Sequence, residues 1–141
     1  MSKEMKVKKL SDKATLPVRN NDDDAGLDLY STEDVVIPPG EGRLIPSNIA
    51  IELPPSSVGL ICDRSSVGSK GIKVHGGVVD VPYRGDIKVC LWNNSKVPYE
   101  IKQGHKIAQI LVIPILIMKP VESTELSDTT RGSKGFGSSG K

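Results

Sequence analysis

The chain has 141 residues, a mass of 15.1 kDa and a net charge of +2 at pH 7. This length is typical of one domain that can bury a core of its own. The balanced charge and an aromatic content of only 4% argue against nucleic acid as a partner, because such a surface needs a basic field or stacking platforms. A small anionic ligand stays open, since a local basic cluster does not require a basic protein.

Cysteine usage and hydropathy bear on the compartment. Cys62 and Cys90 lie in apolar runs without metal-ligand spacing, and we interpret them as reduced thiols. Segment 1–10 is polar and lysine-rich, unlike a secretory signal. The most apolar run, 107–118, is shorter than a bilayer span and contains Gln109. We therefore expect a soluble cytoplasmic protein, or a nuclear one if the source is eukaryotic or viral, with no membrane partner.

Glycine and proline recur at short intervals and separate short runs rich in β-branched residues. In one run Ile87, Val89 and Leu91 recur with the period of two that places alternate side chains on one face of a strand. This spacing of strands and turns predicts an all-β sandwich or barrel. The predicted strands are 34–38, 42–53, 58–63, 77–81, 85–93, 97–101 and 106–119.

Helical patterns are weak throughout the chain. One or two turns can start at Arg64, where Ser65 and Ser66 are suited to cap the first N–H groups. One further turn is possible over 122–128. We therefore expect very little helix.

The composition changes after residue 123. Segment 124–141 is polar and glycine-rich, so it cannot bury a core and should be mobile in isolation. It nevertheless contains the only phenylalanine of the chain, Phe136, close to Arg131. We predict a body over 1–123 and, over 124–141, an arm that docks onto something.

Two polar segments in the first half of the chain are candidates for chemistry. Segment 24–31 is an acidic turn that enters a strand and contains Asp28, although an ordinary solvated turn also explains it. The second places Arg64, Ser65 and Ser66 at the possible helix start, where outward N–H groups and the helix dipole suit a phosphate. An ordinary capped turn is the alternative there.

Segment 74–86 predicts a hairpin, with two strands joined by a turn around 82–85. Asp80 is a carboxylate in an apolar strand, where a charge is costly unless it has a partner or a catalytic role. A turn-capping acid is the alternative. Gly76 and Gly77 carry no side chains, so a flat ligand can meet bare peptide groups there.

Gln109 is the only uncharged polar side chain inside a strongly apolar predicted strand. It is either a satisfied core glutamine or a ligand contact. The chain lacks a convincing nucleophile, a zinc cluster and a dinucleotide fingerprint. This inventory favours water as attacker, a carboxylate as base and a metal for phosphates.

Taken in order with the C-terminal segment, these stretches resemble the five sequence motifs of the trimeric dUTPase family. The resemblance covers about 24–140. It implies a distorted jelly-roll β fold and a homotrimer with three active sites at subunit interfaces, each closed by a C-terminal arm. It also implies hydrolysis of dUTP to dUMP and pyrophosphate, which limits uracil in DNA and supplies dUMP for thymidylate synthesis.

The resemblance assigns roles to individual residues. Asp80 would be the general base that activates the water attacking the α-phosphorus in line. Tyr83 would pack under the deoxyribose and exclude the 2′-hydroxyl of UTP. The main chain at Gly77, Val78 and the strand near Lys88 would pair with the uracil edge.

The other motifs would hold the phosphates. Arg64, Ser65 and Ser66 would bind them directly, with Gln109 near the α-phosphate. Asp28 would contact Mg²⁺ through water, because magnesium chelated by a triphosphate keeps most of its waters. In the arm, the implied contacts are Arg131 on the γ-phosphate, Phe136 stacked on uracil, and Gly137, Ser138 and Ser139 around the phosphates.

Three positions depart from the common family pattern. Asp63 stands where a proline is usual, and it either weakens phosphate binding or points away. Pro82 replaces a frequent acid, and Lys134 replaces a frequent glycine.

Two other functions are compatible with the same scaffold. A dCTP deaminase shares the fold and an Arg-Ser-Ser segment, but it needs a glutamate where this chain has Cys90. A binding or regulatory module on the same scaffold is the other, since fold alone does not settle function. The retained set of Asp80, Tyr83, Arg131 and Phe136 favours an enzyme.

Overall fold

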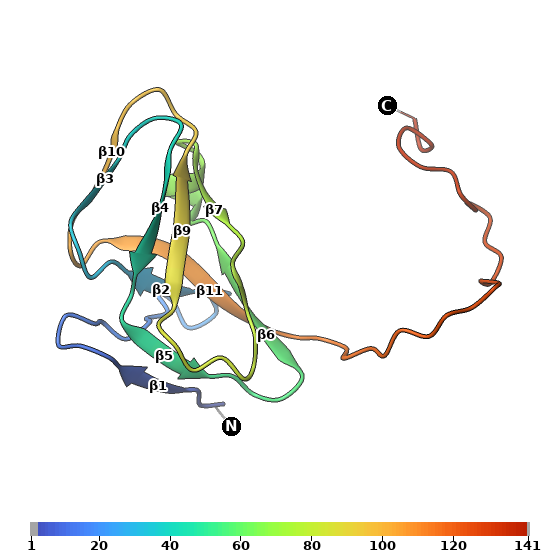
Figure 1. The fold of residues 1–141 in the computed structure, drawn as a ribbon, viewed down its shortest axis with the longest axis horizontal. Helices are drawn as coiled ribbons and strands as arrows, with labels where there is room; N and C mark the ends of the chain where they lie inside the picture. Colours follow the sequence, from blue (N-terminus) through green and yellow to red (C-terminus); the bar gives the residue numbers. More distant parts are fainter. Residues whose placement is uncertain (1–2, 141) are drawn as a thin grey trace.

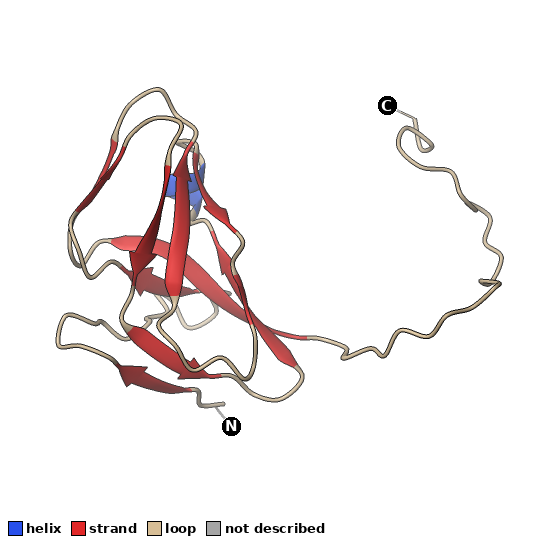
Figure 2. Cartoon of the chain, viewed as in Figure 1, coloured by secondary structure: helices blue, strands red, loops and turns tan. Residues whose placement is uncertain are grey.

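The computed structural model describes residues 3–140. Met1, Ser2 and Lys141, at the ends of the predicted body and arm, lie outside the described residues. The described chain is almost entirely strand and loop, with one four-residue helix (Figure 2), so the all-β prediction is confirmed. The elements are β1 (Lys6–Lys9), β2 (Leu27–Tyr30), β3 (Val35–Ile37), β4 (Gly42–Pro46), β5 (Ile49–Glu52), β6 (Ser57–Cys62), α1 (Ser65–Gly68), β7 (Ile72–His75), β8 (Val78–Val79), β9 (Lys88–Asn93), β10 (Tyr99–Ile101) and β11 (Lys106–Pro114).

The strands form antiparallel sheets that enclose one core (Figure 1). A four-stranded sheet has the order β2-β11-β6-β8, and a three-stranded sheet has the order β4-β9-β7. Two further pairs, β1-β5 and β10-β3, close the ends. The longest strand, β11, pairs with β2 on one side and β6 on the other, so Gln109 lies opposite both Asp28 and Cys62.

The core is aliphatic. Strand alternation sends Val89 and Leu91 of β9 inward, where they meet Ile45 of β4 and side chains of the other sheet such as Ile107 and Ile110. Among the described residues the largest fully buried side chains are isoleucine, leucine, valine and one asparagine. The aromatic side chains are therefore left nearer the surface, where they are available for ligands or partners.

The structure corrects the predicted hairpin over 74–86. Val74 and His75 belong to β7 and pair with β9, as the prediction requires. Strand β8 pairs with β6 instead, so the part of the first arm that precedes the turn belongs to the other sheet. Gly76 and Gly77 adopt φ values of 70° and 95°, which favour glycine, and turn the chain from one sheet to the other. The Gly77 carbonyl then accepts a hydrogen bond from Ile61 N at 2.7 Å, which fixes β8 beside β6.

Local interpretations around the helix and the arm were also wrong in part. Ser65 and Ser66 are the first helical residues and do not cap α1; the N-cap is Arg64, without a side-chain bond. Segment 122–128 is exposed and contains no helical turn. The predicted strand 42–53 is divided into β4 and β5 by a left-handed residue, Asn48, with φ of 54°.

The chain leaves the body after β11. Within residues 3–140 the last main-chain hydrogen bond to the body joins Ile115 N to Ser56 O at 2.9 Å. Beyond it the chain extends away as a long exposed segment (Figure 1), and Leu116 is 84% exposed. The division into a body over 1–123 and an arm over 124–141 stays a prediction. No helix within 3–140 is long and apolar enough to cross a membrane.

Asn93 offers a test of this architecture. Its buried amide donates to Ile37 O and Val97 O at 2.9 and 2.8 Å, and its Oδ1 accepts from Ser95 N at 2.9 Å. Asn93→Ala removes the side-chain donor from both carbonyls and the acceptor from Ser95 N, which should lower the free energy of unfolding by about 2 kcal/mol in urea titration. The exposed Asn94→Ala should change it by less than about 0.5 kcal/mol. Equal effects of the two substitutions would contradict this account.

Candidate active site

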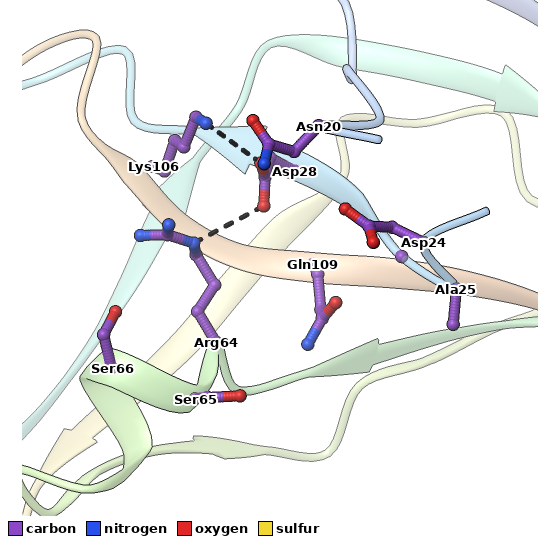
Figure 3. A pocket seen from close by; sticks show the side chains of 10 residues that line it. Asn20, Asp24, Ala25, Asp28, Arg64, Ser65, Ser66, Lys106 and Gln109 are labelled. Atoms are coloured by element: carbon purple, nitrogen blue, oxygen red, sulfur yellow. Dashed lines mark ion pairs between the residues drawn. The ribbon is translucent and has the colours of Figure 1, made fainter. Parts of the chain in front are cut away.

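Asp28 lies at the centre of a charged cluster (Figure 3). Its side chain is only 13% exposed, and its two oxygens face different cations. Arg64 Nε lies 3.4 Å from Oδ1, and Lys106 Nζ lies 3.2 Å from Oδ2. The two cations outnumber the carboxylate, so this cluster carries net positive charge and suits an anionic ligand.

This cluster forms one wall of a polar cleft of about 490 Å³, a volume usual for small-molecule sites. Side chains from β2, β11 and the β6–α1 turn point into it (Figure 3). The structure thereby brings together every body residue predicted to hold phosphates or metal. The lining consists of Asn20, Asp24, Ala25, Gly26, Asp28, Arg64, Ser65, Ser66, Lys106 and Gln109.

Gln109 is half-buried in this cleft and organises its floor. Its Nε2 donates to the main-chain oxygen of Asp63 at 2.9 Å and so holds the turn that carries Arg64. Its Oε1 lies against Gly26, where an added Cβ would be only 2.1 Å away. Gln109 therefore anchors the turn, and Gly26 provides the space for it.

The unusual Asp63 points away from the cleft. Its carboxylate forms an ion pair with Lys73 of β7 and accepts a hydrogen bond from Val74 N at 2.6 Å. The charge beside Arg64 in the sequence is thus neutralised on the other side of the turn. Of the two interpretations of this departure, the structure supports the one in which Asp63 points away from the cleft.

Residues predicted to recognise the nucleoside line a second cleft of about 250 Å³. Asp80 is exposed at the turn after β8, and Tyr83 is 46% exposed. The Tyr83 hydroxyl donates to the main-chain oxygen of Asp86 at 2.8 Å. The lining consists of Ile61, Gly77, Val78, Val79, Asp80, Tyr83, Asp86, Ile87 and Lys88.

The predicted arm contacts lie elsewhere. Phe136 is fully exposed, and Arg131 Nε donates only locally, to Lys134 O at 2.8 Å. Gly137, Ser138 and Ser139 are exposed as well. The two clefts have no lining residue in common. Within residues 3–140 of one chain, the predicted residues therefore form three separate groups.

The donor set limits how a metal can bind. Among residues 3–140, no group of three His, Cys, Asp or Glu side chains could hold an ion directly. Asp24 already accepts two bonds from Asn21, and Asp28 faces two cations. A bare divalent cation does not fit there, whereas hydrated magnesium carried by an anionic ligand does.

Arg64 also influences Tyr99 of β10. Burial raises the pKa of the Tyr99 phenol above its ordinary value, and the positive charge of Arg64 partly opposes that rise. The phenol is therefore neutral near pH 7 and adds no negative charge beside Arg64.

Comparison with known proteins decides the family. A family model described as dUTPase matches residues 12–140. The chain belongs to the dUTPase family. This confirms the prediction made from the ordered polar segments, and with it the distorted jelly-roll class of the fold.

Relatives of similar length extend across nearly the whole chain. Deoxyuridine 5′-triphosphate nucleotidohydrolase of Gloeothece citriformis is 46% identical over 139 residues, covering 96% of each chain. The protein of the same name from Vaccinia virus is 42% identical over 132 residues, covering 94% of this chain and 90% of its own. A mutant dUTPase of Staphylococcus bacteriophage 80alpha with dUpNHpp superposes with a TM-score of 0.93 at 31% identity, covering 99% of this chain and 100% of its own.

Sequence reasoning gave no role to five residues that line the polar cleft, Asn20, Asp24, Ala25, Gly26 and Lys106. Lys106 lies three residues before Gln109, so simple alternation places it on the opposite face of the strand. A register shift between Lys106 and Ala108 turns it to the same side. Gly26 gave no chemical signal, because its contribution is the space it leaves for Gln109.

Gly26→Ala tests this packing. The added Cβ should displace the Gln109 amide, weaken affinity for dUpNHpp about ten-fold in calorimetric titration, and lower the melting temperature. In the double variant Gly26→Ala/Gln109→Ala the contacts with Gln109 Oε1 and Cδ are removed, so thermal stability should recover in part, because Cβ of residue 109 still lies 3.0 Å from the added Cβ and the bond to Asp63 O is lost, while binding stays weak. Wild-type binding and stability of Gly26→Ala would show that the cleft does not depend on this contact.

Proposed function

We propose that this protein hydrolyses dUTP to dUMP and pyrophosphate, which limits uracil in DNA and supplies dUMP for thymidylate synthesis. The observation that carries the proposal is the cleft in which Arg64, Ser65, Ser66 and Gln109 converge around Asp28, with two cations facing that one carboxylate. Membership of the dUTPase family supports the same substrate.

The triphosphate binds in this cleft. Arg64 supplies charge-assisted hydrogen bonds to the phosphates. Ser65 and Ser66 are the first two residues of α1, so their main-chain N–H groups have no partner within the helix and can donate to the phosphates. Lys106 adds a second cation. Mg²⁺ chelated by the triphosphate, held to Asp28 through water, would neutralise phosphate charge.

Asp80 activates the attacking water. Its exposed carboxylate at the end of β8 takes the proton as the water oxygen bonds to the α-phosphorus. The bond from that phosphorus to the bridging oxygen breaks, and pyrophosphate leaves with the electron pair. The products are dUMP and pyrophosphate, and no covalent enzyme intermediate forms.

The second cleft selects the nucleoside. Tyr83 supports the deoxyribose and leaves no room for a 2′-hydroxyl, while peptide groups at Gly77, Val78 and Lys88 pair with uracil. Main-chain groups are fixed by the sheet, so this recognition needs little rearrangement.

The active form is a homotrimer located in the cytoplasm, or in the nucleus of a eukaryotic or virus-infected cell. Two observations support the assembly. The two clefts are separate in one chain, and Leu116, Ile117 and Met118 form an apolar run at least 73% exposed. Burial against neighbouring subunits would cover that run and bring the clefts of different chains together.

Replacing Asp80 tests the chemistry. Asp80→Asn keeps the size but removes the base, so kcat for pyrophosphate release from dUTP with Mg²⁺ should fall about 10² to 10⁴-fold with KM little changed. The exposed Asp12→Asn is the matched control. UTP and dTTP should be poor substrates, and dCTP should release no ammonia. Undiminished kcat in Asp80→Asn would assign the base elsewhere, and no turnover by the wild type would favour a binding module.

Removing the arm tests closure. Ordering a glycine-rich segment costs conformational entropy, roughly 1 kcal/mol or more per residue. In the bound state, contacts of Arg131 with the γ-phosphate and of Phe136 with the base offset this cost. Truncation before Thr130 should leave a folded trimer by sedimentation but reduce kcat severely. Binding of dUMP, which has no γ-phosphate, should change far less. Full-rate turnover by the truncated protein, or a monomer of the intact one, would contradict this arrangement.

A further inference from the structure

The Tyr83 ring is placed by the residues that follow it. Its hydroxyl donates to Asp86 O, and the ring lies so close over Gly85 that an added Cβ there would be 2.5 Å from the hydroxyl oxygen. The turn is also closed by Tyr83 N donating to Asp80 O at 3.1 Å. The position of Asp86 therefore sets the position of the ring.

Asp86 is held from the β4–β5 connection, 38 residues away in sequence. Asn48 Nδ2 donates to Asp86 Oδ2 at 3.2 Å, and Asn48 Oδ1 accepts from Ser11 Oγ at 2.8 Å. Next to this pair, Ser47 Oγ donates to Ile87 O at 2.5 Å. Main-chain bonds at Ile87, from Ile87 N to Ile49 O at 2.9 Å and from Ser47 N to Ile87 O at 3.3 Å, and these side-chain bonds together tie the C-terminal end of the Tyr83 turn to the body.

Both members of the pair carry an energetic penalty. Asn48 has φ of 54°, a conformation that asparagine tolerates better than most residues but that glycine adopts without strain. Within residues 3–140, Asp86 Oδ1 is buried with no hydrogen-bond partner, which opposes burial of a carboxylate. Packing alone does not require either penalty, since glycine and an apolar side chain would avoid both. Penalties of this kind are retained where geometry is functional.

We propose that Asn48 and Asp86 form a positioning clamp that sets the Tyr83 ring and thereby the selection of deoxyribose over ribose. Asn48 fixes the Asp86 carboxylate, the Asp86 main chain fixes the Tyr83 hydroxyl, and the ring then closes the space at the sugar 2′ position. The effect of the clamp on sugar selection rests on the proposed function. Its effect on the position of the Tyr83 turn can be measured without enzyme turnover.

Asn48→Gly is the sharpest variant, because it removes the side-chain bond and relieves the backbone strain together. We expect faster amide hydrogen exchange over 80–87 and a fall of about ten-fold in the ratio of kcat/KM for dUTP to that for UTP. Ser56→Gly is the matched control, since Ser56 also has positive φ (55°) but lies in the β5–β6 turn. It should change neither quantity.

Exchanging the two side-chain types provides a rescue. Asn48→Asp alone places two carboxylates against each other and should open the turn further. The double variant Asn48→Asp/Asp86→Asn restores one donor facing one acceptor. It should therefore recover both the wild-type exchange rate and the wild-type ratio of kcat/KM for dUTP to that for UTP. Unchanged exchange in Asn48→Gly would overturn the clamp. So would faster exchange with an unchanged ratio, because the pair would then be only structural. If the proposed function is wrong, the wild-type protein will not turn over dUTP. In that case the hydrogen-exchange measurements still test whether Asn48 and Asp86 hold the Tyr83 turn in place.

Discussion

The ion pairs of Asp28 hold together the three strands on which the polar cleft depends. Asp28 comes from β2, Lys106 from β11, and Arg64 directly follows β6. These strands are neighbours in one sheet, with β11 between β2 and β6. Gln109 of β11 lies opposite Asp28 of β2 and Cys62 of β6. Displacement of any one strand would separate the charges. The electrostatics of the cleft therefore depend on the geometry of the sheet.

The distribution of charge around that constraint explains how a nearly neutral protein can bind a polyanion. Lys73 neutralises Asp63 on the far side of the β6–α1 turn, while Arg64 and Lys106 share one carboxylate on the near side. The excess positive charge is therefore confined to the immediate surroundings of Asp28, and the net charge of +2 for the whole chain gives no indication of it.

The aliphatic core has a second consequence. Because isoleucine, leucine and valine fill the interior, Tyr83 and Phe136 remain exposed and free to contact a nucleoside. They lie in different parts of one chain, as do the two clefts. In the proposed homotrimer, groups from different subunits would complete the site.

By itself, the sequence determined the all-β class, the short helix after Arg64 and most of the polar residues that line the two clefts. Period-two patterns, turn residues and the order of the polar segments are local properties, so they can be recognised in the sequence without a structure. Tertiary structure decided which strands pair. Within the predicted 74–86 hairpin, Val74 and His75 do pair with β9, but Val78 and Val79 pair with β6 instead. Gly76 and Gly77 redirect the chain between sheets, and nothing local to the sequence shows which partner a strand finds. Lys106 joined the cleft through a bulge that alternation cannot anticipate. The direction of Asp63 was likewise fixed by Lys73 and Val74 on another strand, because a charge turns toward its partner in space and not toward its neighbour in sequence.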